Sequence, residues 1–449
     1  MFSLRPPRGP FPVAALTFVA PVSPALTVGD ATLAATNIPA LVLEELAFTV
    51  YYPADPSPRA NKGLNWLLRP VNAVLRGFAH FTGAPVWLMW PVVYLFGTVL
   101  KIPVYPNAPL LHPGDTRKQW PLVIFSHGLA GSRTAYSQLC SEMAAAGRVV
   151  LAIEHRDGTA PACAPRGRTV LYYREDDVAF PPDTEGPPAF PLRAEQLAFR
   201  QHEVYRIYAA FCGLVRDGPG AGAGLAAIDG ADVDLGSWTP AAGLPVVDCD
   251  DLALAGHSFG GCTMLSILSS PSGAYPPLPV TKVLLYDPWL EPLPTPGPTP
   301  TASISRPSTS TLSEGTPPSE SESELKSSSA LPKMLVINSQ VFSLWKDHFS
   351  RLAGVVDAWE PQGRRLLTLV GSKHVSFSDF PVLPLVRTKA ATTLMERTAM
   401  LSLAFLDGTL DAALERVPTR KMVEKVIGKR KDGRPKRTIV GEVGDVVVH

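Results

Sequence analysis

Residues 250–269 read DDLALAGHSFGGCTMLSILS, and the expected fold of the chain follows from this stretch. Residues 250–256 are an apolar run typical of a buried strand, and the residues after the motif have the composition of a helix. Between the two stands GHSFG (256–260), which matches G-x-S-x-G. A strand that reverses into a helix so quickly needs glycine beside the serine and presents the serine hydroxyl outward. Ser258 is therefore the predicted nucleophile, with an ordinary turn serine as the alternative.

Strand-like and helix-like runs alternate on both sides of this stretch. Apolar strands separated by helices are typical of a parallel sheet that is covered on both faces. With a G-x-S-x-G turn inside such a sheet, the expected fold class is α/β, an α/β-hydrolase fold with a mostly parallel central sheet. The runs that predict strands are LVLEELAFTVYY (41–52), PLVIFSHG (121–128), VVLAIEH (149–155), KVLLYD (282–287), KMLVIN (333–338) and LLTLVG (366–371), and those that predict helices are residues 133–147 and 193–215.

A serine nucleophile needs two partners. Its hydroxyl reacts only when a base takes the proton, so a histidine and an orienting carboxylate are expected, and in this fold class they follow the serine in the order acid, then histidine. Asp287 ends the run KVLLYD and is the predicted acid, with a turn-capping aspartate as the alternative. His374 follows the last strand-like run and is the predicted base. The other histidines beyond Asp287 are His348, within a predicted helix, and the terminal His449.

The oxyanion of an ester-hydrolysis intermediate needs two backbone N–H donors. One donor comes from the residue after the nucleophile, here Phe259, and the other from the loop after an early strand. SHGL (126–129) follows the apolar run PLVIF, so the amide of Leu129 is the second predicted donor. His127 in the same loop is expected to pack the loop rather than to take part in catalysis.

Residues 64–101 form an apolar segment with no charged residue between Phe81 and Leu100. Its length suits a bilayer-spanning helix, but glycines and prolines interrupt it, and tryptophan and tyrosine are scattered through it. A helical hairpin at a lipid interface and a buried lid or core element are the other interpretations. The segment is therefore expected to be an interfacial or lid element of the catalytic domain.

The catalytic domain is expected to span residues 41–415. Residues 1–40, whose apolar run is interrupted by prolines, are expected to form a poorly ordered N-terminal segment. Between residues 291 and 330, 25 of 40 residues are Pro, Ser or Thr, which predicts a disordered insertion. Residues 416–449 contain the basic run GKRKDGRPKR (428–437) and are expected to be a solvated tail, with contact to anionic lipid or a nuclear address as alternatives.

Composition narrows the functional classes. A formal net charge of +1 argues against a nucleic-acid partner. The sequence has no Walker A and no HExxH pattern, so neither a cofactor nor a metal is predicted. The absence of an Asn-x-Ser/Thr sequon favours a cytoplasmic protein, and the apolar segment favours association with membranes; secretion is the alternative, because the N-terminus faintly resembles a signal peptide. Scattered cysteines without CxxC pairing argue against a disulfide framework and against a zinc site. They are Cys140, Cys163, Cys212, Cys249 and Cys262.

With these residues placed, the sequence resembles the platelet-activating factor acetylhydrolases of the plasma and intracellular type II kind and their fungal relatives. The resemblance implies the same three residues, Ser258, Asp287 and His374, and the same two amides as the functional site. It also implies calcium-independent hydrolysis of short or oxidised sn-2 acyl groups from phospholipids at a membrane or lipid-particle surface. The blocks that carry it are FSHGLAGSRTAYS (125–137), AIEHRDGTAPA (152–162), LRAEQLAFRQHE (192–203), LAGHSFGG (254–261), LLYDPWLEPL (284–293), VINSQVF (336–342) and GSKHVSFSDF (371–380).

Three rival functions share parts of this pattern. A general carboxylesterase or lipase would use the same chemistry on other esters, and an acyltransferase would use a lipid alcohol in place of water. A non-catalytic membrane-binding module would need the apolar segment alone. The cluster His155, Arg156 and Asp157, which follows a strand-like run, is expected to be structural.

Overall fold

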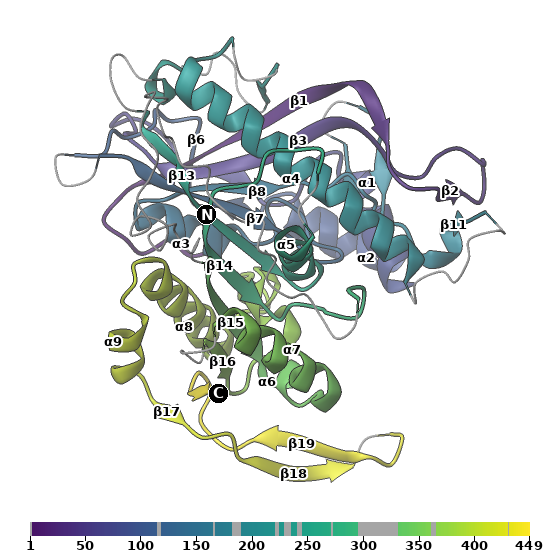
Figure 1. Cartoon of the computed structure of the whole chain (residues 1–449), viewed down its shortest axis with the longest axis vertical. Coiled ribbons are helices and arrows are strands. Elements are labelled where there is room, and N and C mark those ends of the chain that lie inside the picture. The colour runs from purple at the N-terminus through teal and green to yellow at the C-terminus, as the bar shows by residue number, and fades with distance from the viewer. Residues whose placement is uncertain are drawn as a thin grey trace, which may run out of the picture.

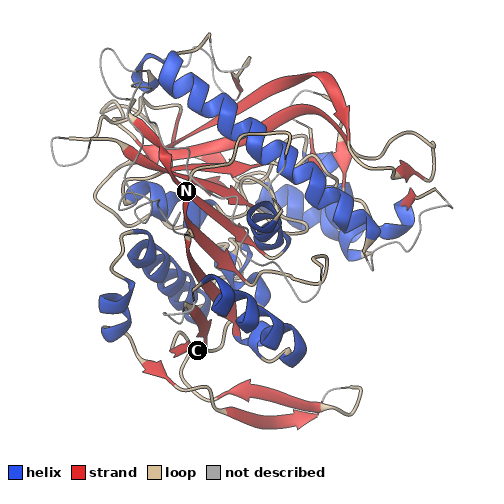
Figure 2. Cartoon of the chain, viewed as in Figure 1, coloured by secondary structure: helices blue, strands red, loops and turns tan. Residues whose placement is uncertain are grey.

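Strand β13 (Val247–His257), which carries the first half of the motif stretch, lies inside a sheet of 12 strands in the computed structural model of the chain. The strands follow the order β12-β1-β3-β8-β7-β13-β14-β15-β16-β20-β17, and β6 pairs with β1. The six strands from β8 to β16 are parallel neighbours, while β3 and β20 join them antiparallel at the two sides. The expected mostly parallel central sheet with helices on both faces is confirmed (Figures 1 and 2).

The predicted strands are present with small shifts at their ends. They are β3 (Val42–Pro53), β7 (Trp120–Ser126), β8 (Val149–Ile153), β14 (Val280–Tyr286), β15 (Lys333–Ser339) and β16 (Leu366–Leu369). The other strands of the sheet are β1 (Val13–Thr27), β6 (Tyr105–Pro106), β12 (Ala226–Ile228), β17 (Thr419–Arg420) and β20 (Val446–Val448).

The structure describes residues 2–114, 118–164, 167–181, 190–220, 224–228, 235–239, 245–270, 273–294, 331–360, 365–429 and 431–449. Most of the predicted Pro/Ser/Thr-rich insertion, from residue 295 to residue 330, lies outside the described residues.

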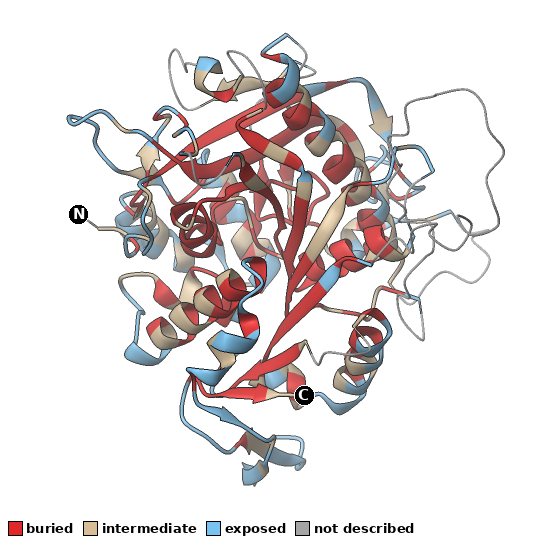
Figure 3. Ribbon diagram, turned by 60° about the vertical axis from the view of Figure 1, so that its left-hand side comes forward, coloured by how far each residue is buried: buried red, intermediate tan, exposed pale blue. Residues whose placement is uncertain are grey.

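Alternating side chains of each strand enter two separate hydrophobic cores. In β7, Leu122 and Ile124 belong to one core, whereas Val123 and Phe125 belong to the other. A strand buried on both faces reads as a continuous apolar run, which is why these strands could be recognised from the sequence. Burial is deepest along the sheet and on the inner sides of the helices (Figure 3).

The helices divide between the two faces of the sheet. On the first face lie α4 (Pro191–Asp217), α5 (Phe259–Ser269) and α7 (Lys346–Trp359), whose buried side chains join the first core. On the other face lie α1 (Val71–Thr82), α3 (Ser137–Ala145), α8 (Lys389–Leu406) and α9 (Leu410–Glu415). This arrangement leaves the carboxyl ends of the parallel strands free to carry loops, and those loops hold the candidate site.

The expectation of a poorly ordered segment over residues 1–40 is wrong. Residues 13–27 form β1, which pairs with β3 along most of its length, and Phe18 is fully buried between the sheet and α4. The prolines explain the mistaken prediction. Pro21 stands where the register between β1 and β3 shifts, so it ends the regular ladder without preventing the pairing of Val13–Ala20.

The tail expected over residues 416–449 is solvated along the described part of its basic run, but its last residues belong to the central sheet. The last residues form β20, which pairs antiparallel with β16 and buries Val446 and Val447 completely. The basic run itself forms a hairpin of β18 (Glu424–Lys429) and β19 (Pro435–Ile439). Three apolar residues after a basic stretch are too short a signal to predict a strand from the sequence.

The apolar segment is divided into several elements rather than one helix. It begins and ends in the short paired strands β4 (Leu64–Asn65) and β5 (Lys101–Ile102), which enclose α1, α2 (Val86–Val92) and the π-helix η1 (Val93–Gly97). Helix α1 packs one face on the second core, while α2 and η1 have no buried residue. Of the helices that the structure describes, none combines the length and the apolar character needed to cross a membrane.

Candidate active site

Ser258 lies on the turn between β13 and α5, with a backbone φ of +57° and ψ of −119°. Few residues other than glycine adopt this conformation, and the strain is typical of a serine held at a strand-to-helix turn. Close packing explains the flanking glycines. A Cβ on Gly256 would lie 2.4 Å from the carbonyl oxygen of Gly260, and a Cβ on Gly260 would lie 2.0 Å from that of Ser126.

Backbone hydrogen bonds hold the turn in place. The N–H of Ser258 donates to the carbonyl oxygen of Tyr286 at 2.9 Å, and its own carbonyl oxygen accepts from Trp289 at 3.1 Å and Cys262 at 3.0 Å. The strained turn is therefore tied both to its own helix and to the neighbouring strand β14. The side chain, 7% exposed, points its hydroxyl at a histidine.

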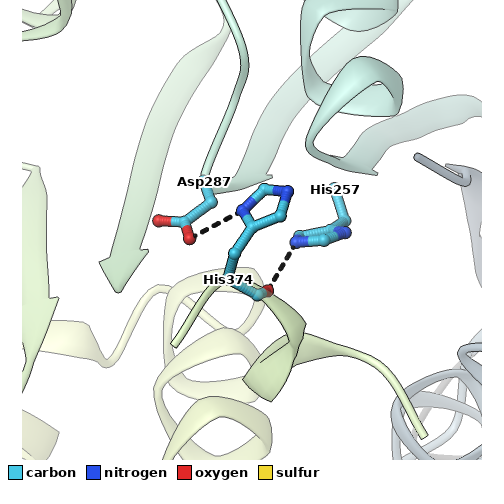
Figure 4. A group of neighbouring side chains, drawn as sticks. All are labelled: His257, Asp287 and His374. Carbon is cyan, nitrogen blue, oxygen red and sulfur yellow. Dashed lines mark hydrogen bonds and ion pairs between the residues drawn. The ribbon is translucent and has the colours of Figure 1, made fainter. Parts of the chain in front are cut away.

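His374 lies between the serine and the acid. Its Nε2 is 2.9 Å from Ser258 Oγ. Its Nδ1 is 3.0 Å from Asp287 Oδ2, the pair drawn in Figure 4. Asp287 is fully buried, and its other carboxylate oxygen accepts a 2.5 Å hydrogen bond from the N–H of Ser339. Because Asp287 fixes Nδ1, the Nε2 nitrogen is left to accept the serine proton, which is the arrangement that a serine nucleophile requires.

Aromatic packing orients the His374 ring further. The ring of Phe342, from the short helix α6 (Gln340–Ser343), stacks on it with centroids 4.4 Å apart and planes within 3° of parallel. Phe342 follows Ser339, which bonds Asp287, so one segment after β15 positions both the acid and the ring of the base. The stacked face leaves the imidazole little freedom to rotate away from Ser258.

His257, the residue before the serine, supports the base from the other side. Its Nε2 is 2.9 Å from the backbone carbonyl oxygen of His374 (Figure 4). Its Nδ1 is 2.8 Å from the hydroxyl of Tyr136. A carbonyl can only accept, so Nε2 carries the proton and Nδ1 accepts from Tyr136. Burial, together with the nearby His374, holds the pKa of His257 well below its usual range, which keeps the ring neutral.

These hydrogen bonds also bear on metal binding. His257, Asp287 and His374 each place a potential ligand atom within 4.8 Å of the others. However, both nitrogens of His257 are engaged, one as donor and one as acceptor, so this ring offers no free lone pair to a cation. The arrangement fits a hydrogen-bonded acid–base group better than a metal centre.

The two predicted oxyanion donors flank the serine. Phe259 begins α5 directly after Ser258, and Leu129 lies in the loop after β7. That loop approaches the nucleophile closely, because a Cβ on Gly128 would lie 2.8 Å from Ser258 Cβ. Among the described residues, the N–H groups of Leu129 and Phe259 have no acceptor in the protein, so both are free to bind a ligand oxygen.

Buried charges support the loop that carries Leu129. The Arg200 guanidinium donates to the carbonyl of His127 at 2.8 Å, pairs with Asp157 at 2.7 Å, and lies over the ring of Phe259 at 4.6 Å. One cation therefore contacts both sides of the predicted oxyanion pocket. His155, Arg156 and Asp157 are all buried in this network, in agreement with the structural role expected for them.

A second Ser-His-Glu set occurs in the same network. Ser126 Oγ is 2.7 Å from His155 Nε2, and His155 Nδ1 is 2.5 Å from Glu203 Oε2. These side chains are at most 1% exposed, and Ser126 Oγ also accepts from Arg200 at 3.3 Å. A substrate carbonyl cannot reach a hydroxyl enclosed in this way, so geometry alone does not make Ser126 a nucleophile.

The loop that carries His374 is anchored by Asp379. This buried carboxylate accepts from the indole N–H of Trp66 at 2.9 Å and from the backbone N–H groups of Ser137 at 2.9 Å and Gln138 at 3.0 Å. It thereby caps the start of α3, while burial raises its pKa to about 6 in spite of these hydrogen bonds. The base loop is thus fixed to both the apolar segment and the second face of the sheet.

The structure brings together all five residues that the sequence singled out, from four different loops. The motif and chain order were enough to name Ser258, Asp287 and His374. They gave no role to His257, Tyr136 and Phe342, although His257 stands inside the motif. Contacts between loops more than 100 residues apart, such as Tyr136 with His257, leave no local pattern in one sequence.

Comparisons with known proteins relate the chain to one family. The sequence model of the family described as "Platelet-activating factor acetylhydrolase, isoform II" matches residues 19–297. The platelet-activating factor acetylhydrolase of Bos taurus is 29% identical over 230 residues, 49% of this chain and 46% of the relative. That of Cavia porcellus is 25% identical over 341 residues, 74% of this chain and 63% of the relative. The chain thus spans about half the length of the first curated relatives it matches.

A solved structure supports the fold independently. The ferulic acid esterase of Streptomyces cinnamoneus matches with a TM-score of 0.52, covering 91% of this chain and 93% of that chain at 17% identity. Similarity at this level shows the shared architecture and not a shared substrate. The family model covers more than half of the chain and includes the turns of Ser258 and Asp287, so the chain belongs to the platelet-activating factor acetylhydrolase isoform II family.

Proposed function

We propose that this protein is a serine esterase that hydrolyses the sn-2 acyl ester of phospholipids whose acyl group is short or oxidised, as in platelet-activating factor. The observation that carries the proposal is the continuous contact from Ser258 Oγ through His374 to Asp287, at 2.9 and 3.0 Å. Family membership supports the phospholipid as substrate, and the free amides of Leu129 and Phe259 support acyl transfer.

The proposed mechanism needs no group beyond the chain and water. His374 Nε2 takes the hydroxyl proton as Ser258 Oγ attacks the sn-2 carbonyl carbon, and the amides of Leu129 and Phe259 bind the resulting oxyanion. The tetrahedral intermediate then expels the lysophospholipid oxygen, which takes the proton from His374. Water attacks the acyl-serine with His374 again as base, and the short carboxylic acid leaves. No step requires calcium.

The substrate would reach this site from a lipid surface. The α2–η1 face, a name used here for residues 86–99, consists of side chains that a folded protein rarely exposes together. Trp87 is 74% exposed and Leu95 is 65% exposed. The preceding helix α1 contacts α2 and also packs Phe78 on Phe380, six residues after His374, so α1 connects the face to the base loop. The other exposed members are Val86, Leu88, Trp90, Val92, Phe96 and Val99.

We place this activity in the cytoplasm, with membrane association through the α2–η1 face. All five cysteines are free and buried, as suits a reducing compartment. A test of location is the distribution of the full-length chain between soluble and membrane fractions of its own cells. Recovery only from the culture medium would contradict the proposal.

The decisive test of the activity is calcium-free hydrolysis of phosphatidylcholines with sn-2 chains from acetyl to palmitoyl, comparing wild type with Ser258→Ala. Release of short acyl groups, with a loss of about 10⁶ in rate in the variant, is the expected result. Hydrolysis of simple esters alone would contradict the phospholipid assignment and favour a general esterase. An acylated lipid alcohol in place of free acid would identify an acyltransferase, and unchanged activity in Ser258→Ala would refute the proposed nucleophile.

A further inference from the structure

The hairpin of β18 and β19 stands apart from the rest of the fold. Its two strands pair with each other and with no other described strand, and they form a separate two-stranded sheet. In Figure 1 they extend away from the body of the molecule at its C-terminal end. A two-stranded hairpin without a third strand or a helix to cover it is marginally stable in water, so a surface of this kind suggests a partner.

The hairpin concentrates positive charge. Residues 421–440 hold eight basic and two acidic residues, a formal charge of +6, whereas the whole chain carries only +1. The remainder of the chain is therefore negative by 5. Arg437 pairs with Glu424, and Arg434 approaches Asp432 at 3.8 Å. The hairpin lysines form no ion pair with any residue that the structure describes, and they are Lys421, Lys425, Lys429, Lys431 and Lys436.

Aliphatic side chains are exposed among these lysines. Val426 is 57% exposed and Ile427 is 52% exposed, and both lie in the middle of β18. Val423 and Val440, at the base of the hairpin, are also exposed. Exposed aliphatics between basic residues are suited to an interface that is anionic at its surface and apolar below it.

The base of the hairpin is fixed beside the candidate site. Met422 and Ile439 pack on Val370, the residue that follows β16. Gln340 donates from Nε2 to Thr438 of β19 at 3.1 Å, and its Oε1 accepts from the N–H of Gly371 at 3.1 Å. Gly371 begins the loop that carries His374, so the hairpin extends from the same edge of the sheet as the site.

We propose that the β18–β19 hairpin is a docking surface for anionic phospholipid membranes. The proposal deepens the proposed function and rests on it, because the same membrane would supply the ester. The occupant follows from charge and shape. A bilayer surface contacts the protruding cationic hairpin alone, whereas a nucleic acid long enough to wrap the chain would meet the negative charge of the remainder. The exposed Val426 and Ile427 also favour lipid over a phosphodiester backbone.

Vesicle binding tests this surface without requiring turnover. The full-length chain carrying Ser258→Ala is mixed with phosphatidylcholine vesicles with and without phosphatidylserine, and the bound fraction is measured by flotation. The protein with the wild-type hairpin is expected to bind the phosphatidylserine vesicles more strongly than the others. This preference should disappear at about 1 M salt, where the screening length falls to about 3 Å. Reversal of two charges, Lys425→Glu with Lys429→Glu, is expected to weaken binding to these vesicles at least about 30-fold.

A matched control distinguishes an effect of the hairpin lysines from an effect of the net charge of the protein. Lys118→Glu, just ahead of β7, with Lys333→Glu, at the first residue of β15, makes the same charge change at the amino ends of the parallel strands. This double variant is expected to keep the vesicle preference of the wild type. Folding of both double variants is checked in the Ser258 background by hydrolysis of a water-soluble short-chain ester. Equal loss in the two double variants, or no loss in the hairpin variant, would overturn the inference.

The remaining outcomes distinguish this inference from the proposed function. Hairpin-dependent binding to phosphatidylserine vesicles without any phospholipid hydrolysis by the Ser258 protein would support the docking surface and contradict the proposed substrate. Hydrolysis of short-chain phospholipids by a protein whose vesicle binding does not change with the hairpin charges would support the proposed substrate and contradict the docking surface. Hairpin-dependent binding to duplex DNA in place of the vesicles would also overturn the membrane proposal.

Discussion

His257 connects the two halves of the site through hydrogen bonds at both ring nitrogens. On one side its Nε2–H donates to the backbone of His374, and on the other its Nδ1 accepts from Tyr136. The Tyr136 hydroxyl in turn accepts from the N–H of Gly128 at 3.3 Å, directly before Leu129. A single chain of hydrogen bonds therefore runs from the base loop to the loop of a proposed oxyanion donor.

Tyr136→Phe removes the hydroxyl in the middle of this chain. We expect kcat to fall about 10-fold with little change in KM, because an oxyanion donor that is displaced but not deleted costs less than the 10²–10³ of a lost donor. Steady-state hydrolysis of a soluble ester measures both constants. Tyr52→Phe deletes an equally buried hydroxyl, bonded to the carbonyl of Ala108, and is expected to leave kcat unchanged. Equal effects in the two variants would contradict the role of Tyr136.

Glu154 is a buried carboxyl that depends on a single cation. Its Oε2 accepts from the backbone N–H of Arg133 at 3.0 Å and from its guanidinium at 3.2 Å, while Oε1 has no partner among the described residues. Burial raises its pKa to about 7, with Arg133 opposing part of the shift. The folded protein thus keeps this proton to a higher pH than the unfolded chain does.

The stability from this group should therefore be present at low pH and lost as the pH rises through about 7. Glu154→Gln cannot ionise, so the free energy of unfolding of wild type relative to the variant should fall by on the order of 3 kcal/mol between about pH 4 and pH 8. Urea denaturation at a series of pH values measures this difference. A difference that rises with pH would show that the charged form is the one that the fold stabilises.

Among the elements, the strand-turn-helix of β13 and α5 was the most predictable. Its apolar strand, two glycines and helical continuation agree with one another locally, and no distant contact is needed to recognise them. The edges of the sheet were not predictable in this way. β1 contains Pro21, and β20 is three residues long, so both depend on tertiary pairing with β3 and β16 rather than on local preference.

The α2–η1 face should act on lipid surfaces only. Trp87→Ser with Leu95→Ser removes two of its most exposed apolar side chains, and we expect binding to phosphatidylcholine vesicles to weaken roughly 100-fold. Hydrolysis of a soluble ester should be unchanged, because neither residue contacts the site. Leu331→Ser, at the amino end of β15, is the matched control and should change neither vesicle binding nor hydrolysis of the soluble ester. Loss of soluble-ester hydrolysis in the double variant would contradict an interfacial role.

At the scale of the whole molecule, the site is assembled from loops at one edge of the sheet. The family match ends at residue 297, so it includes the nucleophile and the acid but not His374. The position of the base is given by the fold itself, which brings the loop after β16 to the turns that follow β13 and β14. The helix α1 that precedes the α2–η1 face packs on Phe380 of this loop region, and the basic hairpin is connected to it through Gln340, which bonds both Thr438 and Gly371.

The residues that we propose to act chemically could be named from the sequence because their order and spacing are properties of the strand ends. The residues that position them could not. Separate loops converge on the site, and only this convergence brings Phe342, Tyr136 and Asp379 to it. An aromatic or acidic residue in a loop can serve many other structural roles, so its presence in the sequence does not predict this one. For the same reason the second Ser-His-Glu set could not be predicted from the sequence. Its hydrogen-bond distances are similar to those among Ser258, His374 and Asp287, but its side chains are more deeply buried.

In the proposed mechanism Ser258 is the residue that becomes acylated. The most direct measurement is reaction of the full-length chain with a phospholipid-like fluorophosphonate, followed by peptide mass spectrometry. We expect one adduct per chain, on the peptide that contains Ser258, and none in Ser258→Ala. An adduct on Ser126, or on any residue that survives Ser258→Ala, would contradict the assignment.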